Sequence, residues 1–404
     1  MTPILLRLMR GFLGLLGAFL VCPLAMAGDA RSSELTKSKG RIEENQAVAG
    51  ARKSHIAGEE IFAQPTLIDM VLTLSPEALS SLRKEPRGWV EGTAKIEGRE
   101  IARVAVHLKS STSFLPLDQK PSFTLNFDKH ASGRRLFGLR KIHLNNSVQN
   151  PSYLNEDLAG ELFRRAGVPC ARAAWATVRL NERVLGLYVL KEGFTPEFLA
   201  LNFKQTDGNF YDGGLHHDIF EDLKLESGGG PQDHSDLKTL SGATQIADLA
   251  ARWQQLRQLV DMDRFVSMMA MESITCHIDG YSLMQNNYRI YFEPASRRAV
   301  FIVHGMDRMF EQVDYPVEPP MVSVLSQAVL TVPEGRKIYR RRLAELGETV
   351  FQPAWMTNRI DAVIRLLKPA EPLVEPEGNA VRQRVLARVA VVRKYLAEHP
   401  ANKP

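Results

Sequence analysis

The chain has 404 residues, of which 44% are hydrophobic and 24% charged, with three cysteines and a formal net charge of +5. This composition is typical of a globular protein and excludes a low-complexity or intrinsically disordered chain. The basic residues are dispersed and lack interleaved aromatic residues. The sequence therefore predicts no nucleic-acid-binding groove.

The first 27 residues have the pattern of a cleaved secretory signal. Arg7 and Arg10 precede an apolar run over 11–24, and Ala25-Met26-Ala27 supplies a small-residue cleavage site. The run is too short for a comfortable membrane span. We expect an exported protein, periplasmic or extracellular after cleavage near Ala27, with no transmembrane span in the mature chain. Cys22 leaves lipid anchoring open as an alternative.

Removal of residues 1–27 leaves about 375 residues, enough for one large domain or two ordinary ones. Residues 28–62 are polar and poor in aromatic residues, and they are predicted to form a flexible leader. Residues 63–404 are predicted to form one domain of the α+β class. We expect a strand-rich lobe over 63–200 and a helical lobe with the site over 201–404.

Two cysteines, Cys170 and Cys276, remain in this domain. An oxidising compartment would permit a disulfide between them. Two buried free thiols are equally compatible with the sequence, because unpaired cysteine is among the most buried residue types.

Alternating apolar and polar residues predict a series of half-buried antiparallel strands in the first part of the domain. Turn residues at Glu97-Gly98 and Asn181-Glu182 are expected to join two pairs of strands as hairpins. A helix over 152–166, ended by Gly167, interrupts the series. The expected strands are 66–74, 89–96, 101–109, 122–127, 141–145, 174–180 and 184–190.

The second part of the domain is predicted to be mainly helical. Residues 202–243 are expected to form a surface loop, because Gly228-Gly229-Gly230 lacks the Lys-Ser/Thr of a phosphate-binding loop. An apolar helix over 263–275 leads directly to Asp279. Two strands, 288–292 and 299–303, are expected to form a hairpin, and the remaining residues are helical up to a long helix over 380–398.

The segment between Cys276 and Asp307 carries the most informative chemical pattern. Asp279 follows the helix, Asn286 and Asn287 come next, and Asp307 lies just after the second strand of the hairpin. In kinase-type phosphoryl transfer one carboxylate meets the hydroxyl, while an amide and a second carboxylate hold the metal. Asp, Asn and Gly are also common turn formers, so the local pattern alone leaves a structural interpretation open.

Further motifs occur in an order that resembles the spore-coat-protein-H (CotH) kinase-like family. Lys120-Pro121-Ser122-Phe123 is similar to its K-x-S-[FY] strand. The family's hairpin motif, N-x-x-x-x-G-x-Y-x-x-x-E, is matched by Asn181, Gly186, Tyr188 and Glu192. The resemblance covers residues 65–310, and its other elements are Lys109-Ser110-Ser111-Thr112-Ser113, Leu136-Phe137-Gly138-Leu139, Leu144-Asn145-Asn146, Gly167-Val168-Pro169, Asp279-Gly280-Tyr281, Asn287-Tyr288 and Asp307.

The resemblance implies an atypical protein-kinase-like fold that binds ATP with Mg²⁺ or Mn²⁺. Its implied reaction is phosphate transfer to a hydroxyl of a protein acceptor, in known members a serine. Asp279 would then be the base or substrate-orienting carboxylate, and Asp307 would hold the metal against the phosphates. Asn287, with Asn286 as the alternative, would be the amide ligand; a hard cation with few protein oxygens suits this set.

The resemblance also requires a cation on the phosphates, and Lys120 is the first candidate, with Glu192 as the carboxylate that orients it. Lys109 is the second candidate. Lys191 is the third, because strand alternation points it away from Glu192. Glu161 on the helix over 152–166 is an alternative ion-pair partner. Each lysine alone is more often a solvated surface charge.

One departure from the family's sequence pattern bears on the catalytic activity that the resemblance implies. The family usually has P-W-D-x-D before the second acid, whereas this chain has Val303-His304-Gly305-Met306-Asp307, so Gly305 replaces a carboxylate. Export also takes the protein away from cytoplasmic ATP. A catalytically weak or inactive envelope or surface assembly protein of the same fold therefore stays open. A carbohydrate hydrolase would use Asp279 and Asp307 as paired acids, but the sequence has no sugar-stacking aromatic run to support it.

Overall fold

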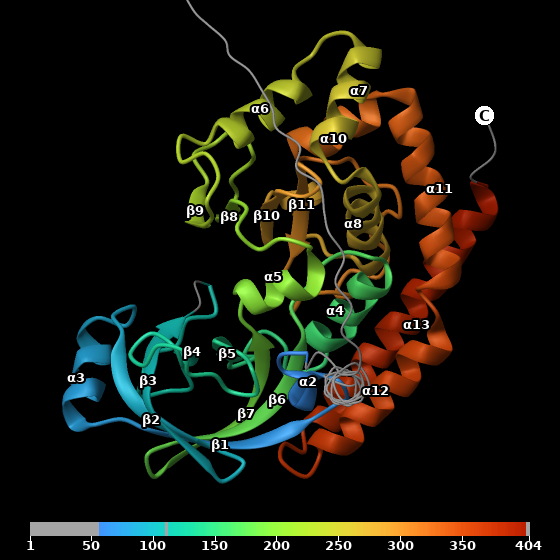
Figure 1. Cartoon of the computed structure of the whole chain (residues 1–404). Helices are drawn as coiled ribbons and strands as arrows, with labels where there is room; N and C mark the ends of the chain where they lie inside the picture. Colours follow the sequence, from blue (N-terminus) through green and yellow to red (C-terminus); the bar gives the residue numbers. More distant parts are fainter. Residues whose placement is uncertain (1–55, 110–111, 401–404) are drawn as a thin grey trace, which may run out of the picture. The chain divides into compact units, whose positions relative to one another are not determined.

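The structure is a computed structural model that describes residues 56–109 and 112–400 (Figure 1). The predicted signal peptide over 1–27 and residues 28–55 of the predicted leader lie outside the described residues. Residues from Ile56 onward form one compact unit. Its first half is rich in strands and its second half in helices, as expected for the α+β class.

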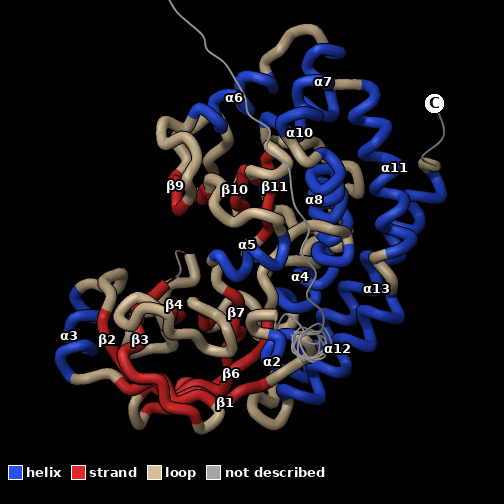
Figure 2. The backbone as a smooth tube through the Cα atoms, in the orientation of Figure 1, coloured by secondary structure: helices blue, strands red, loops and turns tan. Residues whose placement is uncertain are grey.

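Seven strands of the first half form a closed barrel in the order β1-β2-β3-β4-β5-β7-β6 (Figure 2). Neighbouring strands pair antiparallel, except that β1 runs parallel to β6. The bounds are β1 Leu67–Thr73, β2 Val90–Ile96, β3 Arg99–Lys109, β4 Ser122–Asn126, β5 Lys141–Asn145, β6 Ala173–Leu180 and β7 Arg183–Glu192.

The alternation in the sequence sets which side chains fill the barrel. In β1, for example, Ile68, Met70 and Leu72 are buried in the barrel core while the residues between them are more exposed. The strands lie where the sequence predicts them to within about three residues. The parallel pairing of β1 with β6 is not predictable from alternation, because alternation specifies the buried face and not the neighbouring strand.

A second sheet, in the order β11-β10-β8-β9, belongs to the helical half. β10 Tyr288–Glu293 and β11 Arg298–Val303 form the predicted hairpin. β8 Phe210–Asp212 and β9 Lys224–Ser227 come from the segment predicted as a loop. That prediction was wrong for these residues, since strands of three and four residues are too short to show a clear alternation. It was also wrong for helix α6 Ser235–Thr244, which begins inside the same segment.

Most of the helices lie on one side of this second sheet, with α12 and α13 beside the barrel, whereas α3 lies at the far end of the barrel (Figure 1). Their bounds are α2 Glu59–Phe62, α3 Pro76–Lys84, α4 Asn155–Arg165, α5 Pro196–Asn202, α6 Ser235–Thr244, α7 Leu249–Leu259, α8 Met262–Thr275, α9 Tyr281–Met284, α10 Val324–Thr331, α11 Pro333–Thr349, α12 Pro353–Leu367 and α13 Val374–Glu398.

Helix α4 connects the two halves, because it packs against β6 of the barrel and against α8 and α12. Leu158, Leu162 and Phe163 lie on its buried face. Two acids of its first turn, Glu156 and Asp157, are also buried. A buried carboxylate needs a partner, and Asp157 has one in Arg359 of α12, with Oδ1 and Nη2 2.6 Å apart.

Three further features bear on the sequence predictions. The ordered fold begins before residue 63, because Ile61 of α2 is buried and Arg172 Nη2 donates to the carbonyl of Ala57 at 2.6 Å. Cys170 and Cys276 are both free and buried, and burial raises their thiol pKa values to about 12 and about 11. Among the described residues no helix is both long enough and apolar enough for a membrane span.

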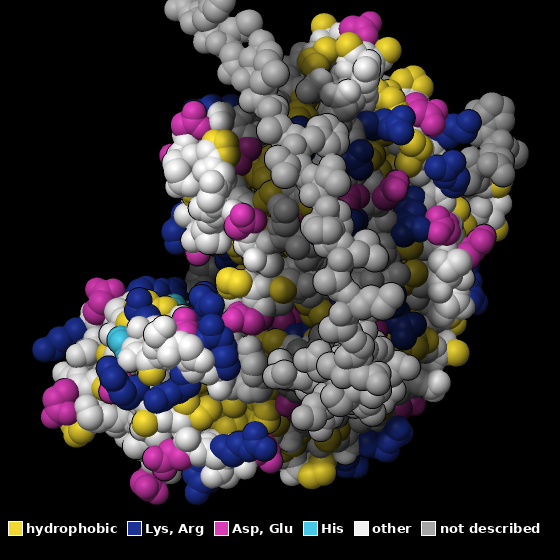
Figure 3. All heavy atoms as spheres, viewed as in Figure 1, with side chains coloured by type: hydrophobic (Ala, Val, Ile, Leu, Met, Phe, Trp, Pro, Cys, Tyr) yellow, Lys and Arg dark blue, Asp and Glu magenta, His cyan; other side chains and the backbone are white. Residues whose placement is uncertain are grey.

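The charged side chains on the face drawn in Figure 3 follow the dispersed pattern of the sequence. Lys and Arg are scattered over both halves of the domain and lie among Asp and Glu.

Candidate active site

The predicted site residues of the second half border a cavity of 450 Å³ that also reaches the barrel. The barrel side contributes residues from β3, β5, β7 and α4, and the other side contributes the loops around β10 and β11. The charged and amide side chains in its wall are Lys109, Asn145, Gln149, Glu156, Lys191, Asp279, Asn286, Asn287, Asp307 and Arg308.

An ion pair on the barrel side joins Lys191 of β7 to Glu156 of α4. Lys191 Nζ lies 2.6 Å from Glu156 Oε1, and both side chains are buried. Glu156 Oε2 is buried without a hydrogen-bond partner. A buried pair holds its geometry because separating the charges in a low-dielectric interior costs several kcal/mol. The pair therefore fixes the Lys191 ammonium at the cavity wall.

Lys109, at the end of β3, places a second ammonium in the same wall. Its Nζ donates to Asn145 Oδ1 at 3.2 Å. Burial, and then the neighbouring charge of Lys191, lower the pKa of Lys109 to about 8. Two ammonium groups that repel each other in one wall of a cavity favour an anionic ligand beside them.

Asp279 borders the same cavity as the two lysines and lies on the loop that follows α8. Cys276 ends this helix in the left-handed conformation, with φ of 56°, and the chain turns so that Asp279 enters the cavity. Asn286 Nδ2 donates to Asp279 Oδ1 at 2.8 Å, and Asn287 Nδ2 donates to Oδ2 at 2.7 Å. Both amides of the predicted pair therefore orient this carboxylate.

A buried carboxylate beneath the loop, Glu272 of α8, holds the loop in place. It accepts hydrogen bonds from the backbone N–H groups of Tyr281 and Ser282, each at 3.0 Å. Burial raises the pKa of Glu272 to about 7. On the other side of α9, buried Asp218 accepts from Tyr281 Oη and from the Gln285 amide, both at 2.8 Å. Sequence reasoning did not identify either acid.

Asp307 follows β11, and its backbone is anchored to the start of α4. Its carbonyl oxygen accepts from Asn150 Nδ2 at 2.8 Å and from Asn155 Nδ2 at 2.7 Å. Burial raises the pKa of the Asp307 carboxyl, and the Glu156 carboxylate adds to the shift. A cation beside Asp307 would offset this cost.

Comparison with known proteins identifies the family. The family described as CotH kinase protein matches residues 112–395, well over half of the chain. This chain belongs to that family.

Two curated relatives support the assignment. Inner spore coat protein H of Bacillus subtilis is 26% identical over 276 residues, which cover 62% of this chain and 73% of the relative. Invasin CotH2 of Rhizopus delemar is 20% identical over 285 residues; the match covers 62% of this chain but only 47% of that relative. The CotH chain described here therefore spans about half the length of the second relative.

Two solved structures show a distant similarity. The Helicobacter pylori proinflammatory kinase CtkA aligns with a TM-score of 0.34 and 8% identity, over 68% of this chain and 94% of its own. The HipA, HipB and operator DNA complex of Shewanella oneidensis aligns with a TM-score of 0.38 and 13% identity, over 73% and 69%. The α+β class expected from the sequence is the one that the structure shows, in a chain of the CotH kinase family.

The donor set of the CotH cavity fits a divalent cation. Asp307 supplies a carboxylate, Asn287 an amide oxygen, and Glu156 Oε2 is a buried carboxylate oxygen without a hydrogen-bond partner. Mg²⁺ and Mn²⁺ prefer such hard oxygen ligands and keep several waters. The described residues contain no group of three or more His, Cys, Asp or Glu side chains placed to hold a metal, so such a cation would also rely on amide, water and phosphate oxygens.

Gly305, which replaces the first acid of the family pattern, lies against Asn287. Its φ of 63° is left-handed, and a Cβ at this position would stand 2.2 Å from Asn287 Oδ1. A side chain cannot be added here without moving the amide that orients Asp279. In this structure the Asn287 amide thus occupies the space that a carboxylate side chain at position 305 would need.

The structure does not bring Lys120 or Glu192 to the cavity wall. Lys120 Nζ donates to Tyr153 Oη at 2.7 Å and lies over the Tyr188 ring, 5.2 Å from its centroid. Glu192 Oε1 pairs with Arg172 Nη2 at 2.6 Å. Strand alternation explains the absence of Glu192 from the cavity wall, because Lys191 and Glu192 point to opposite faces of β7 and only Lys191 faces the cavity.

Glu161 is also absent from the cavity wall, since it pairs with Arg164 and Arg165 on its own helix. The acid that pairs with Lys191 is Glu156, which lies on a different face of the same helix from Glu161. One signal in the sequence could have identified it. Glu156 lies three and seven residues before Ala159 and Phe163, on the apolar face of the helix, where a carboxylate requires a basic partner.

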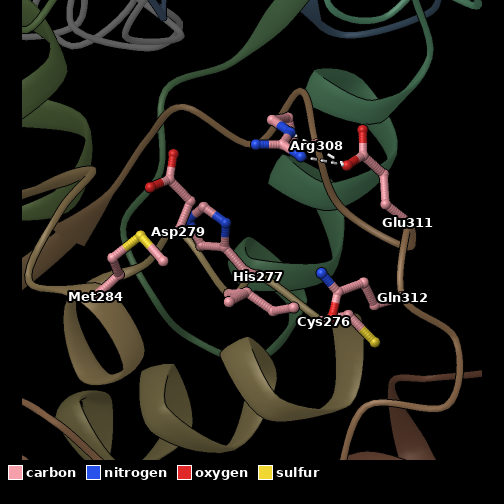
Figure 4. Close-up of a pocket in the computed structure, with 8 residues that line it drawn as sticks. Cys276, His277, Asp279, Met284, Arg308, Glu311 and Gln312 are labelled. Carbon is pink, nitrogen blue, oxygen red and sulfur yellow. Dashed lines mark hydrogen bonds and ion pairs between the residues drawn. The ribbon is translucent and has the colours of Figure 1, made fainter.

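A smaller hollow of 120 Å³ adjoins the cavity at Asp279 (Figure 4). Asp279, Met284 and Arg308 border both spaces. In Figure 4, Asp279 and Met284 lie on one side of the hollow. The ion pair between Arg308 Nη2 and Glu311 Oε2, 2.9 Å apart, lies on the other. Asp279 therefore stands where two spaces meet.

Proposed function

We propose that this CotH-family protein transfers phosphate from ATP, with Mg²⁺ or Mn²⁺, to a hydroxyl of a protein acceptor. The observation that carries the proposal is the buried Lys191–Glu156 ion pair, which borders the same cavity as Asp279, Asn287 and Asp307. A lysine fixed by a helix glutamate, opposite a carboxylate and a metal-binding amide and acid, is the arrangement required for kinase-type phosphoryl transfer.

Each side chain has a separate task in this mechanism. Lys191, held by Glu156, and Lys109 contact the phosphate oxygens and stabilise their negative charge. Asp279, fixed by Asn286 and Asn287, accepts a hydrogen bond from the acceptor hydroxyl and orients its oxygen for attack. Asp307 and the Asn287 amide oxygen would hold a divalent cation, which would supply further charge neutralisation at the phosphates.

The test is phosphate transfer from γ-labelled ATP by the purified protein with Mg²⁺ or Mn²⁺ and protein acceptors. Asp279→Asn keeps the size of the side chain but removes the base, so we expect transfer to fall at least about hundredfold. Nucleotide affinity, measured by thermal shift, should change little. Equal transfer by the wild type and Asp279→Asn would contradict the proposed role.

A second function is favoured by Gly305, which removes one metal-binding acid of the family pattern. The protein would then use the same fold for non-catalytic assembly or binding at the envelope or surface, in agreement with the predicted export signal. A wild-type protein that shows neither labelling nor stabilisation by nucleotide and metal would favour this alternative, since a ligand that binds the native state raises its stability.

A further inference from the structure

Several exposed apolar side chains lie at the cavity or on the chain segments hydrogen-bonded to helix α9 beside it. Leu215, Phe220, Met284 and Val322 are 51%, 61%, 38% and 47% exposed, and we call them the apolar rim. Leu215 and Met284 also border the cavity itself. Exposed apolar groups that adjoin a functional cavity mark a binding surface more often than scattered single residues do.

The segments that carry the rim are tied to one another through hydrogen bonds. His216 Nδ1 lies 3.2 Å from the Met284 carbonyl oxygen, and the Val322 N–H donates to the Ser282 carbonyl at 2.8 Å. Asp218, two residues before Phe220, accepts from the backbone N–H of Val324 at 2.8 Å. Asp218 also accepts from Tyr281 and Gln285 at either end of α9. These hydrogen bonds fix the segments relative to one another, so the rim is an ordered surface and not a set of independent loops.

The smaller of the two spaces that meet at Asp279 limits what can enter it. The hollow beside Asp279 has a volume of 120 Å³, less than the roughly 150 Å³ of a cavity that accommodates benzene. One short hydroxyl side chain fits there. The residues before and after the acceptor residue cannot follow it into the hollow, so they lie on the surface around the mouth, where Met284 borders both the hollow and the cavity.

We propose that the acceptor is a polypeptide segment that carries an apolar residue next to its hydroxyl residue, and that this apolar side chain packs on the apolar rim. The inference rests on the proposed phosphotransferase function, and it adds the sequence preference of the acceptor. Its physical basis is that apolar surface on both partners leaves water on binding.

The test uses two fluorescent peptides that differ only at the residues flanking a single serine, Leu-Ser-Leu in one and Gln-Ser-Gln in the other. Binding is measured by anisotropy with a non-hydrolysable ATP analogue and Mn²⁺, so it does not depend on catalysis. We expect the wild type to bind the leucine peptide at least about tenfold more tightly. The double variant Phe220→Ser/Val322→Ser should bind both peptides equally and keep the wild-type nucleotide affinity.

Val184→Ser is the matched control, because Val184 is 73% exposed in the hairpin between β6 and β7 and does not border the cavity. It should keep the preference for leucine. Equal wild-type binding of the two peptides would overturn the inference. A loss of nucleotide affinity in the double variant would also overturn it, because the rim would then bind the nucleotide. A change in the oligomeric state of the double variant would do the same, because the rim would then contact a second copy of the chain. Peptide preference without phosphate transfer would support the inference while contradicting the proposed function.

Discussion

Lys191 Nζ lies 2.6 Å from Glu156 Oε1, and this contact joins a barrel strand to the helix that also packs against α8. Helix α8 leads directly into the loop that carries Asp279. The Asp307 carbonyl is held by Asn155 of the same helix. Helix α4 thus places the ion pair, and anchors the acid of the candidate metal site, from a single rigid element.

The first prediction concerns this ion pair. Lys191→Met should lower phosphate transfer by at least about hundredfold, because the phosphates lose a positioned cation. It should also destabilise the protein by about 3–5 kcal/mol, because Glu156 is left buried without its partner. Lys191→Met/Glu156→Gln should regain most of that stability but no transfer. Urea unfolding and labelled-phosphate transfer measure the two effects.

Lys120→Met is the matched control, because Lys120 does not border the cavity. It should lose the contact with Tyr153 and some stability while keeping transfer within about threefold. A larger loss of transfer in Lys120→Met than in Lys191→Met would instead support the assignment made from the sequence.

The second prediction concerns the pH dependence of nucleotide binding. The pKa of Lys109 is lowered to about 8 in the free protein, so its ammonium loses its proton as the pH rises through this value. Nucleotide affinity should fall above pH 8, by at most about tenfold per pH unit. Lys109→Arg should show no such fall, because the guanidinium stays charged. Titration of a fluorescent ATP analogue between pH 6.5 and 9.5 measures the difference. A wild-type affinity that stays constant over this range would exclude a phosphate contact by Lys109.

Much of the fold is predictable because it depends on local patterns. Alternation predicts the barrel strands, and the apolar run before Asp279 predicts α8. Barrel closure through β1 and β6 depends on residues that are more than a hundred positions apart, and β8 and β9 are too short to carry a period. These features come from tertiary packing, which a local pattern does not encode.

The candidate site divides in the same way. The structure brings Asp279, Asn287 and Asp307, all from one stretch of the sequence, to one cavity. The lysine is different, because Lys109 and Lys191 lie on two strands and Lys120 just before a third, and only barrel closure decides which of them reach the cavity. The order of the motifs in the sequence favoured Lys120. The structure instead places Lys191 at the cavity, because its side chain lies on the side of β7 that borders the cavity.

The third prediction concerns stability and the buried acid Glu272. Its pKa is raised from 4.5 to about 7, so the folded state binds this proton more tightly than the unfolded state does. The free energy of unfolding should therefore fall as the pH rises from about 4.5 to about 7, by an amount on the order of 3 kcal/mol from this group. Glu272→Gln should remove this component of the slope. Asp263→Asn, an exposed acid on the same helix, should leave it unchanged. Urea unfolding at several pH values tests this, and a wild-type slope retained in Glu272→Gln would show that another group is responsible.

The fourth prediction concerns Gly305, whose φ of 63° and close approach to Asn287 both oppose a side chain. Gly305→Ala should cost about 1–2 kcal/mol for the left-handed backbone alone, and more because its Cβ displaces Asn287. Gly98→Ala is a matched control: Gly98 has φ of 78°, but a Cβ there meets nothing within 4 Å. The difference in unfolding free energy between the two variants isolates the steric part.

Gly305→Asp then tests whether the family's missing acid can simply be restored. The new carboxylate adds a potential metal ligand, but it enters the space of the Asn287 amide that holds Asp279 Oδ2 at 2.7 Å. We expect Mn²⁺ affinity to rise by less than about tenfold, and phosphate transfer to fall because Asp279 loses an orienting contact. Calorimetric titration with Mn²⁺ and the transfer assay measure the two quantities on the same preparation. A Gly305→Asp protein that binds Mn²⁺ much more tightly and also transfers phosphate faster would show that Asn287 can move aside, and that the replacement by glycine alone limits the metal site.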